Sequence, residues 1–384
     1  MDDLFPVFKY YLVGNNGELS PTDELWRAHL SGDNNNLPVQ DFVFTIGDYL
    51  LSAREFLERN KFQAVRDGLQ NFLDQNVEMV EISEILISLD KHGPFYHPIK
   101  VTIVLKTFEP VFFVLNGAVS DMGLAIIETE YRNLKSLNAF SSNSYVPVAF
   151  DVGFVTSAKG KIGFLLGQWF DGFEEFHVVA ANDKNRIGLL KSDGSFSLIP
   201  ESEAFEIFRQ ASEILTFYYD INSFKQIFPW HHAAGDFIVK INNHGIEVKL
   251  ITVRGYERLV DNDSGNLMFD LLLFFLNLSL RMRIDRDRGT KEYVLLDEFV
   301  VKACVDGFVK GLKNNIKRSG KTGNIDPDFY NIFIEFIKEF DFETILNIFI
   351  IVAGSCSSDV PERSIVEQNL KAHAKAMHRA IKKI

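Results

Sequence analysis

Cysteine is scarce in this chain of 384 residues, which contains only Cys304 and Cys356. Two cysteines cannot build a disulfide framework or a cysteine-based zinc site, so a reduced, cytoplasmic compartment fits the composition best. Cations are outnumbered: 40 Lys and Arg residues stand against 52 Asp and Glu residues, and the net charge is −12. Because general nucleic-acid affinity needs clustered cations that displace counterions, we expect no nucleic-acid partner.

Long apolar runs are absent as well. The most apolar run, Leu267 to Leu280, covers about 14 residues and carries Asp270 and Asn277, so it is too short and too polar to span a bilayer. The N-terminal sequence MDDLFPVFKYY opens with acids and lacks the basic and apolar regions of a signal peptide. We therefore expect no membrane partner.

Two common motifs of acyl transfer and phosphate binding are missing. The chain has no Gly-x-Ser-x-Gly pattern, which would mark a nucleophile elbow. Gly320-Lys321-Thr322 matches the end of a phosphate-binding P-loop, but Asn315 stands where the first glycine belongs. Neither a serine hydrolase of the nucleophile-elbow type nor a P-loop protein is indicated.

The clearest pattern that is present lies in Pro229–Glu257. Its segment 237–241 is short, apolar and β-branched, and 246–251 alternates apolar with charged residues, so both are predicted strands. The intervening segment 242–245, Asn-Asn-His-Gly, favours a tight turn because Asn and Gly tolerate positive φ. A β-hairpin is therefore predicted here.

A loop containing His231, Gly235 and Asp236 leads into this hairpin, and Thr252 follows it. The layout resembles the catalytic hairpin of kinase-like phosphotransferases, in the aminoglycoside phosphotransferase and choline kinase branch. In that family a loop of the type H-G-D-x-H-x-G-N precedes the hairpin, and a metal-binding aspartate follows it. The resemblance puts Asp236 on the family's asparagine and implies that it binds metal. It puts His231 on the catalytic aspartate and Thr252 on the metal-binding aspartate.

The resemblance covers roughly residues 77–260 in the order of the elements. Residues 77–115 are predicted to form three strands of an antiparallel meander, with which a kinase-like small lobe begins. In the family, a lysine near the end of the third strand holds the phosphates, and a glutamate in the next helix pairs with it. The corresponding Glu130 lies in a helix predicted over 124–137, and we expect it to be solvated because the lysine is missing. The nucleotide-contacting positions that the resemblance implies, including the hinge, are Asn116, Glu130, Gln168, Trp169, Phe170 and Thr252.

We predict an α+β, two-lobed protein-kinase-like fold with an antiparallel small-lobe sheet and a mainly helical large lobe. Residues 1–76 are expected to form an N-terminal helical extension, of which 1–38 is loosely structured. Residues 77–172 are the predicted small lobe. Residues 173–384 are the predicted large lobe, and the part that follows the hairpin reads as helical.

Two further segments of the predicted large lobe have distinct patterns. Residues 182–200 contain apolar runs on either side of an Asp-Gly pair, which predicts an inserted hairpin. Residues 281–289 mix arginine and aspartate in a short link between helices. We expect this link to be solvated.

Phosphoryl transfer needs positioned phosphates, a metal held by oxygen ligands and a group that orients the attacking hydroxyl. Because Asn116, His231 and Thr252 replace three charged groups of the family, we predict a degenerate kinase-like protein, or pseudokinase. It would be a non-catalytic binding or regulatory module with a remnant nucleotide cleft and an unknown protein or small-molecule partner. The alternative is an active ATP-dependent small-molecule phosphotransferase, with His231 as base and Asp236 as magnesium ligand. ATP and Mg are the only cofactors that the resemblance implies.

A metal site of different chemistry is a third interpretation. His231, His232 and Asp236 offer imidazole and carboxylate ligands of the kind that suits zinc or iron. Adjacent residues of an extended segment point in opposite directions, however, so both histidines rarely bind one ion. A pair of hydrogen-bonded structural histidines is favoured instead.

Overall fold

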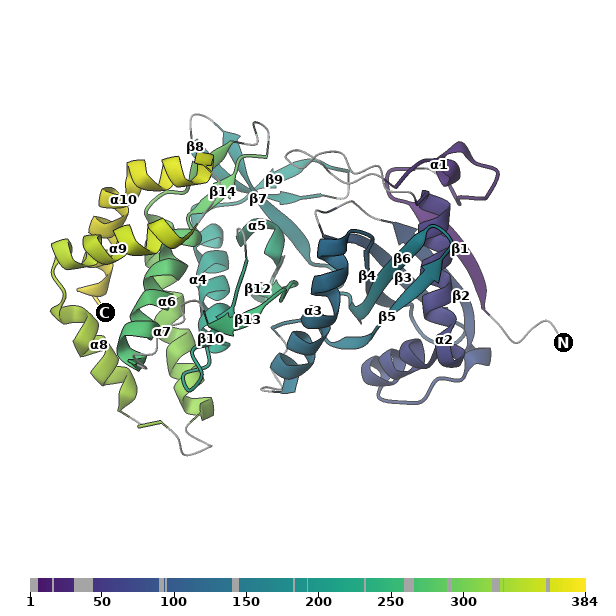
Figure 1. Ribbon diagram of the computed structural model, residues 1–384, viewed down its shortest axis with the longest axis horizontal. Helices are drawn as coiled ribbons and strands as arrows, with labels where there is room; N and C mark the ends of the chain where they lie inside the picture. The colour runs from purple at the N-terminus through teal and green to yellow at the C-terminus, as the bar shows by residue number, and fades with distance from the viewer. Residues whose placement is uncertain are drawn as a thin grey trace. The chain divides into compact units, whose positions relative to one another are not determined.

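The computed structural model describes residues 6–15, 17–30, 44–89, 93, 95–139, 145–181, 184–191, 193–230, 233–258, 266–288, 290, 292–319, 325–326, 328–356 and 360–384. The chain divides into two compact units, Met1–Asp171 and Gly172–Ile384 (Figure 1). Both units combine helices with largely antiparallel strands, so the predicted α+β class is confirmed.

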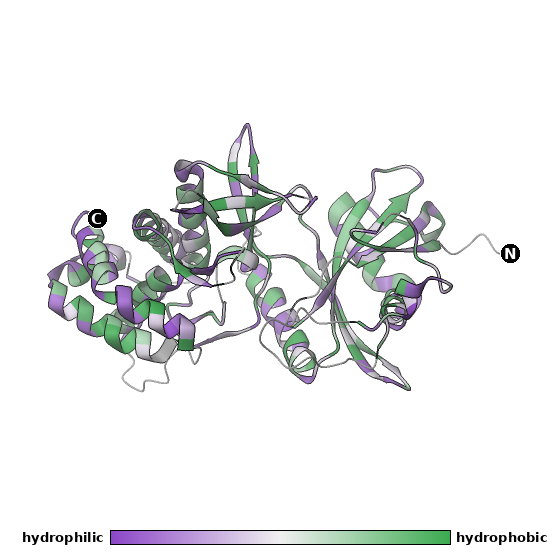
Figure 2. Ribbon diagram, turned by 90° about the horizontal axis from the view of Figure 1, so that it is seen from above, coloured by the Kyte–Doolittle hydropathy of each residue, from purple (hydrophilic) through white to green (hydrophobic). Residues whose placement is uncertain are grey.

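A six-stranded sheet forms the body of the first unit, and its strands are β1 (Val7–Leu12), β2 (Ile82–Leu89), β3 (His97–Leu105), β4 (Val111–Ala118), β5 (Ala149–Ser157) and β6 (Gly160–Gln168). The order is β1-β2-β3-β4-β6-β5; β1 runs parallel to β2, and the other neighbouring pairs are antiparallel. Hydrophobic residues dominate these strands (Figure 2), and alternate residues of β3 are buried. The predicted meander is therefore confirmed as β2, β3 and β4.

The helices of the first unit are α1 (Glu24–Arg27), α2 (Ile46–Leu73), the 3₁₀ turn η1 (Met79–Glu81) and α3 (Asp121–Ala139). A capping box starts α2: the Thr45 hydroxyl accepts from the Asp48 amide, and the Asp48 carboxylate accepts from the Thr45 amide. Residues 59–62 leave helical geometry, so α2 consists of two helical pieces. Its Phe56 packs on Phe164 of the sheet, with ring centroids 5.5 Å apart.

One expectation for the N-terminal part is wrong. Val7–Leu12 is not loosely structured, and the first 76 residues are not only helical, because this strand pairs with β2 along its whole length. Its register runs from Val7 opposite Glu84 to Leu12 opposite Leu89. An edge strand that pairs across about 75 residues of sequence leaves no local signal beyond its own short apolar pattern.

A second sheet lies in the second unit and contains β7 (Glu174–Ala181), β8 (Lys184–Leu190), β9 (Phe196–Leu198), β11 (Phe237–Asn242) and β12 (Gly245–Leu250). Its order is β12-β11-β7-β8-β9, and the strands are antiparallel. Both predicted hairpins are present, as β8–β9 and as β11–β12. The strand β7, which pairs with both of them, was not predicted.

The helices of the second unit are α4 (Glu201–Phe217), α5 (Ala233–Asp236), α6 (Leu267–Arg281), α7 (Phe299–Ser319), α8 (Phe329–Glu339), α9 (Phe342–Cys356) and α10 (Val360–Ile381). Two short antiparallel pairs join them: β10 (Lys225–Ile227) with β13 (Tyr256–Arg258), and β14 (Ile284–Arg286) with β15 (Tyr293–Leu295). The part that follows the hairpin is therefore not entirely helical. Within the described segments, no helix has the length and apolar character needed to cross a membrane.

Glycines allow α4 and α7 to pack closely. A Cβ atom added to Gly307 of α7 would lie 2.1 Å from the carbonyl oxygen of Arg209 in α4. A Cβ atom added to Gly311, one turn later, would lie 2.6 Å from the carbonyl oxygen of Glu213. Real Cβ atoms do not approach backbone oxygen so closely, so the two helices touch at a distance that only glycine permits.

Gly307→Ala should separate α4 from α7 and lower the free energy of unfolding by about 1–3 kcal/mol, the usual cost of overpacking. Gly354→Ala in α9 is the matched control, because its added Cβ meets no atom within 4 Å. That variant should be neutral or slightly more stable, since alanine favours helix over glycine. Urea denaturation measures both, and equal stabilities of the two variants would contradict this packing.

The link between α6 and α7 contradicts the sequence-based expectation. Arg281, Arg283, Asp285 and Asp287 are all at most 6% exposed, so these four charged side chains of the link are not solvated, whereas Arg288 is exposed. Each of these charged side chains has a partner in the protein: Arg283 Nε donates to the Leu296 carbonyl at 2.7 Å, for example. Asp287 Oδ2 accepts from the backbone amide of Ala180 in β7 at 2.8 Å. Ala180 lies 107 residues before Asp287, so composition alone does not reveal this burial.

Arg283 also fixes the protonation of a buried histidine in α10. Its Nη1 lies 3.1 Å from His373 Nδ1, and since arginine only donates, Nδ1 accepts. His373 Nε2 therefore carries the proton and donates to Ser279 Oγ at 3.1 Å, while Ser279 donates to the Leu276 carbonyl. Burial, first, and then the charge of Arg283 hold the pKa of His373 well below its usual range.

Acid should destabilise the protein through His373. The unfolded chain keeps a histidine pKa near 6.5, whereas the folded protein keeps His373 neutral. The unfolded state therefore binds one more proton below about pH 6.5, and the free energy of unfolding falls by up to about 1.4 kcal/mol per pH unit. Denaturation at pH 7 and at pH 5 should show that the free energy of unfolding decreases more in the parent protein than in His373→Gln. Equal losses in both proteins would refute the assignment.

Candidate functional site

The β11–β12 hairpin determines where Asp236 lies. Phe237 pairs with Leu250 at the open end of the hairpin, and the Ile251 amide donates to the Asp236 carbonyl at 2.9 Å. Asp236, which precedes β11, and Thr252, which follows β12, therefore lie side by side. A residue just before one strand and a residue just after its partner are brought together by the register alone.

The Asp236 carboxylate is only 4% exposed and is held by two side chains. Thr252 Oγ1 donates to Asp236 Oδ1 at 2.7 Å, and Arg254 Nη1 donates to the same oxygen at 3.0 Å. The Arg254 side chain is itself only 13% exposed, so this is a buried ion pair. Removing one charge of such a pair leaves the other uncompensated, which costs about 3–5 kcal/mol.

This arrangement bears on the metal role predicted for Asp236 and on the nucleotide contact predicted for Thr252. Their side chains do lie together, but the contact is a hydrogen bond between them, and a guanidinium supplies the positive charge. Among the residues that the structure describes, no group of three or more His, Cys, Asp and Glu side chains is suited to hold a metal ion. His231 and His232, predicted as base and as zinc or iron ligands, lie outside the described residues.

A second buried carboxyl group, Asp285 of β14, was missed in the sequence. Burial, first, and then the negative charge of Asp236 raise the pKa of Asp285 to about 8, although the Arg286 amide donates to its Oδ1 at 2.6 Å. Asp285 is therefore mostly protonated at neutral pH. Arg283, Asp285 and Asp287 alternate along the chain, so one face of a short strand could have been expected to carry all three.

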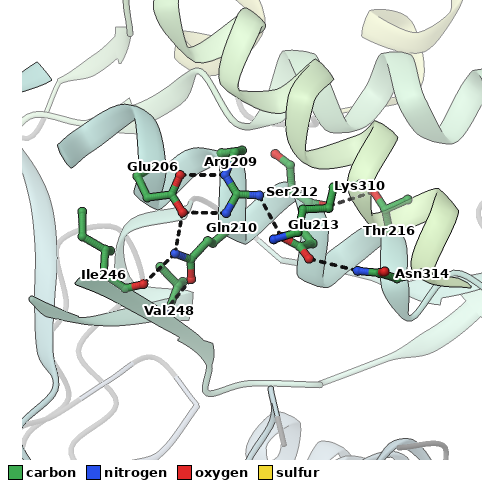
Figure 3. A network of polar contacts seen from close by, with 10 residues as sticks. All are labelled: Glu206, Arg209, Gln210, Ser212, Glu213, Thr216, Ile246, Val248, Lys310 and Asn314. Atoms are coloured by element: carbon green, nitrogen blue, oxygen red, sulfur yellow. Dashed lines mark hydrogen bonds and ion pairs between the residues drawn. The ribbon is translucent and has the colours of Figure 1, made fainter. Parts of the chain in front are cut away.

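Side chains of α4 secure the hairpin at its outer edge (Figure 3). Gln210 Nε2 donates to the Ile246 carbonyl at 2.7 Å, and the Val248 amide donates to Gln210 Oε1 at 3.1 Å. Since β12 is an edge strand, the amide side chain takes the place of a neighbouring strand. Glu206 accepts from Gln210 at 2.7 Å and so orients the amide.

The same network continues from α4 to α7. Arg209 donates to Glu206 at 2.5 Å and to Glu213 at 2.8 Å, and these contacts raise the pKa of Arg209. Glu213 also pairs with Lys310 at 3.1 Å, and it accepts from Asn314 at 3.1 Å (Figure 3). The close helix pair and the hairpin are therefore tied together by one set of polar contacts.

The remaining predicted positions lie in the first unit. Asn116 in β4 is half-buried and stands between Pro98 and Leu165 of the neighbouring strands. Glu130 in α3 is 1% exposed, so the expectation of a solvated glutamate is wrong. Ile127 and Leu134 of the same helix are also buried, so Glu130 lies on the buried face of α3. The spacing of these apolar residues in the sequence already indicated that face.

The predicted hinge follows the last residues of β6. Both the backbone and the side chain of Gln168 bind Val148. The Gln168 backbone amide donates to the Val148 carbonyl at 2.8 Å, and the side-chain Oε1 accepts from the Val148 backbone amide at 3.3 Å. Trp169 and Phe170 are half-buried. Lys100 Nζ lies 5.0 Å from the Trp169 ring centroid, which is a cation–π contact.

Comparisons with known proteins add no family assignment: no family model matches this sequence, and no curated protein matches it either. The class that the structure defines is an α+β protein of two compact units.

Asp285→Asn should remove a pH dependence, because asparagine mimics the protonated acid. The unfolded chain has an aspartate pKa near 3.9, so between about pH 4 and 8 the folded state binds the extra proton. As the pH rises from about 4 to 8, the free energy of unfolding of the parent protein should therefore fall relative to that of the variant, by up to about 1.4 kcal/mol per pH unit. Asp306→Asn, at an exposed site in α7, is the control. Parallel pH profiles for the parent and Asp285→Asn would exclude the raised pKa.

Proposed function

We propose that this chain is a degenerate kinase-like protein of the aminoglycoside phosphotransferase and choline kinase group, acting as a non-catalytic binding module. The order of elements supports the proposal. The first unit has a three-strand meander, then α3, then the β5–β6 hairpin. The second unit has α4, a loop and the β11–β12 hairpin, in the order that the resemblance implies.

The observation that carries the proposal is the ion pair between Asp236 and Arg254. In a kinase-like enzyme the residue at the position of Asp236 helps to hold magnesium, which neutralises the transferring phosphate. Here a guanidinium with a fixed charge contacts the carboxylate at 3.0 Å, and Thr252 donates to the same oxygen. A divalent ion bound at that oxygen would have to displace the guanidinium and the hydroxyl. It would also bring positive charge close to Arg254.

The residue types point in the same direction. Thr252 is neutral where the family has its principal metal ligand, and Asn116 is neutral where the family has its phosphate-holding lysine. Neither can replace the Coulombic contact of a charged group. We infer that the protein binds a small molecule or a protein partner without transferring a phosphoryl group. ATP with Mg is the first ligand to test.

The test is a thermal melt with ATP alone, with ATP and Mg, and with ATP and Mn, combined with a phosphoryl-transfer assay. A ligand that binds the folded state raises stability by RT ln(1 + [L]/Kd), so millimolar nucleotide reports weak affinity. We expect no ATP turnover, and no additional Tm shift when metal joins ATP. Arg254→Ala should expose the Asp236 carboxylate and create a metal-dependent shift, whereas Arg254→Lys should not.

Arg379→Ala, which removes an exposed ion pair with Glu298, controls for the loss of an arginine. Metal-dependent turnover in the parent protein that is lost in His231→Ala would replace the proposal with its alternative, an active phosphotransferase using His231 and Asp236.

A further inference from the structure

A small cavity in the second unit lies between the β10–β13 pair and α6, apart from Asp236. Its lining combines aromatic and polar side chains, and the residues that carry the argument are Tyr219, Phe224, Gln226, Arg258, Asp270 and Phe274. Tyr219 is 1% exposed and Gln226 is 4% exposed, so the polar groups are part of the interior.

Two hydrogen-bond donors at this cavity are left without acceptors. Tyr219 Oη and Arg258 Nε are both buried, and neither has a hydrogen-bond partner within the described protein. A buried polar atom without a partner costs about 1–3 kcal/mol, and native proteins nearly always satisfy such atoms with protein or ordered water. Two of them at the same cavity indicate that it holds an acceptor.

The charges already present decide what kind of acceptor fits. Arg258 Nη2 donates to Asp270 Oδ2 at 3.3 Å, so the guanidinium charge is balanced. Burial, first, and then the charge of Asp270 raise the pKa of Tyr219, which therefore stays a neutral donor. An anion would meet the Asp270 carboxylate, and a cation would meet the guanidinium. A neutral oxygen atom meets neither penalty.

We propose that this cavity is a binding site for one neutral oxygen acceptor, which takes hydrogen bonds from Tyr219 Oη and Arg258 Nε. The cavity volume is about 10 Å³. That is about the space that one water molecule needs, and water makes two to four hydrogen bonds to such groups. The carbonyl oxygen of a small amide is an acceptor of the same chemistry, so it is the second source of the oxygen to be tested.

Tyr219→Phe separates an occupied site from a merely buried hydroxyl, because the two cases predict opposite signs. If an acceptor is bound, the variant loses a hydrogen bond and its Tm falls by about 2–4 °C, as expected for a unit of this size. If no acceptor is bound, the variant loses only an unsatisfied group, and its Tm stays the same or rises. Tyr256→Phe is the matched control, because its hydroxyl donates to the Tyr218 carbonyl at 2.8 Å and its loss calibrates the shift.

Acetamide at 100 mM distinguishes the two sources of the oxygen. If the site takes an amide carbonyl, acetamide raises the Tm of the parent protein more than that of Tyr219→Phe. If water is the occupant, acetamide changes both Tm values equally, and a crystal structure shows an oxygen within about 3.2 Å of both donors. An unchanged or higher Tm for Tyr219→Phe, with no such oxygen in the crystal, overturns the proposal.

Discussion

A carboxylate that is 96% buried cannot stay charged without a partner, and in this protein Arg254 meets that requirement for Asp236. The hairpin register brings Thr252 beside Asp236, and two residues later the chain turns so that Arg254 reaches the same oxygen. The hydroxyl of Thr252 and the guanidinium of Arg254 therefore stabilise one buried carboxylate oxygen. The same charge acts on Asp285, where burial, first, and then the carboxylate of Asp236 raise the pKa.

The hairpin can hold this geometry because α4 holds the hairpin. Gln210 satisfies the outer edge of β12 with both ends of its amide, and Glu206 fixes the orientation of that amide. The helix is in turn held against α7, where Gly307 allows the two backbones to touch. A flexible surface amide could not replace an edge strand. The packing of α4 on α7 therefore helps to place Gln210 where a single side chain satisfies the outer edge of β12.

Local pattern was sufficient for the elements whose partners are close in sequence. The meander of β2 to β4 and both predicted hairpins followed from alternation and turn residues, because each pairs with its immediate neighbour. The strand β1 and the burial of Arg283 and Asp287 did not follow, because their partners are distant. Arg283 donates to His373, 90 residues away, and Asp287 accepts from the backbone of β7, 107 residues away. For the candidate site, the sequence placed Asp236 and Thr252 together, but Arg254 and Asp285 depended on tertiary contacts.

A metal ion and a guanidinium are not equivalent partners for a carboxylate. A bound divalent ion keeps open coordination positions, and in phosphoryl transfer those positions hold the phosphate oxygens. A guanidinium donates in one plane to atoms already in contact with it, and its charge can neither be withdrawn nor exchanged. A guanidinium carries one positive charge, which balances one carboxylate, but it offers no coordination position to a phosphate oxygen. If the proposed function holds, this asymmetry explains how a hairpin keeps its geometry without the groups that phosphoryl transfer needs.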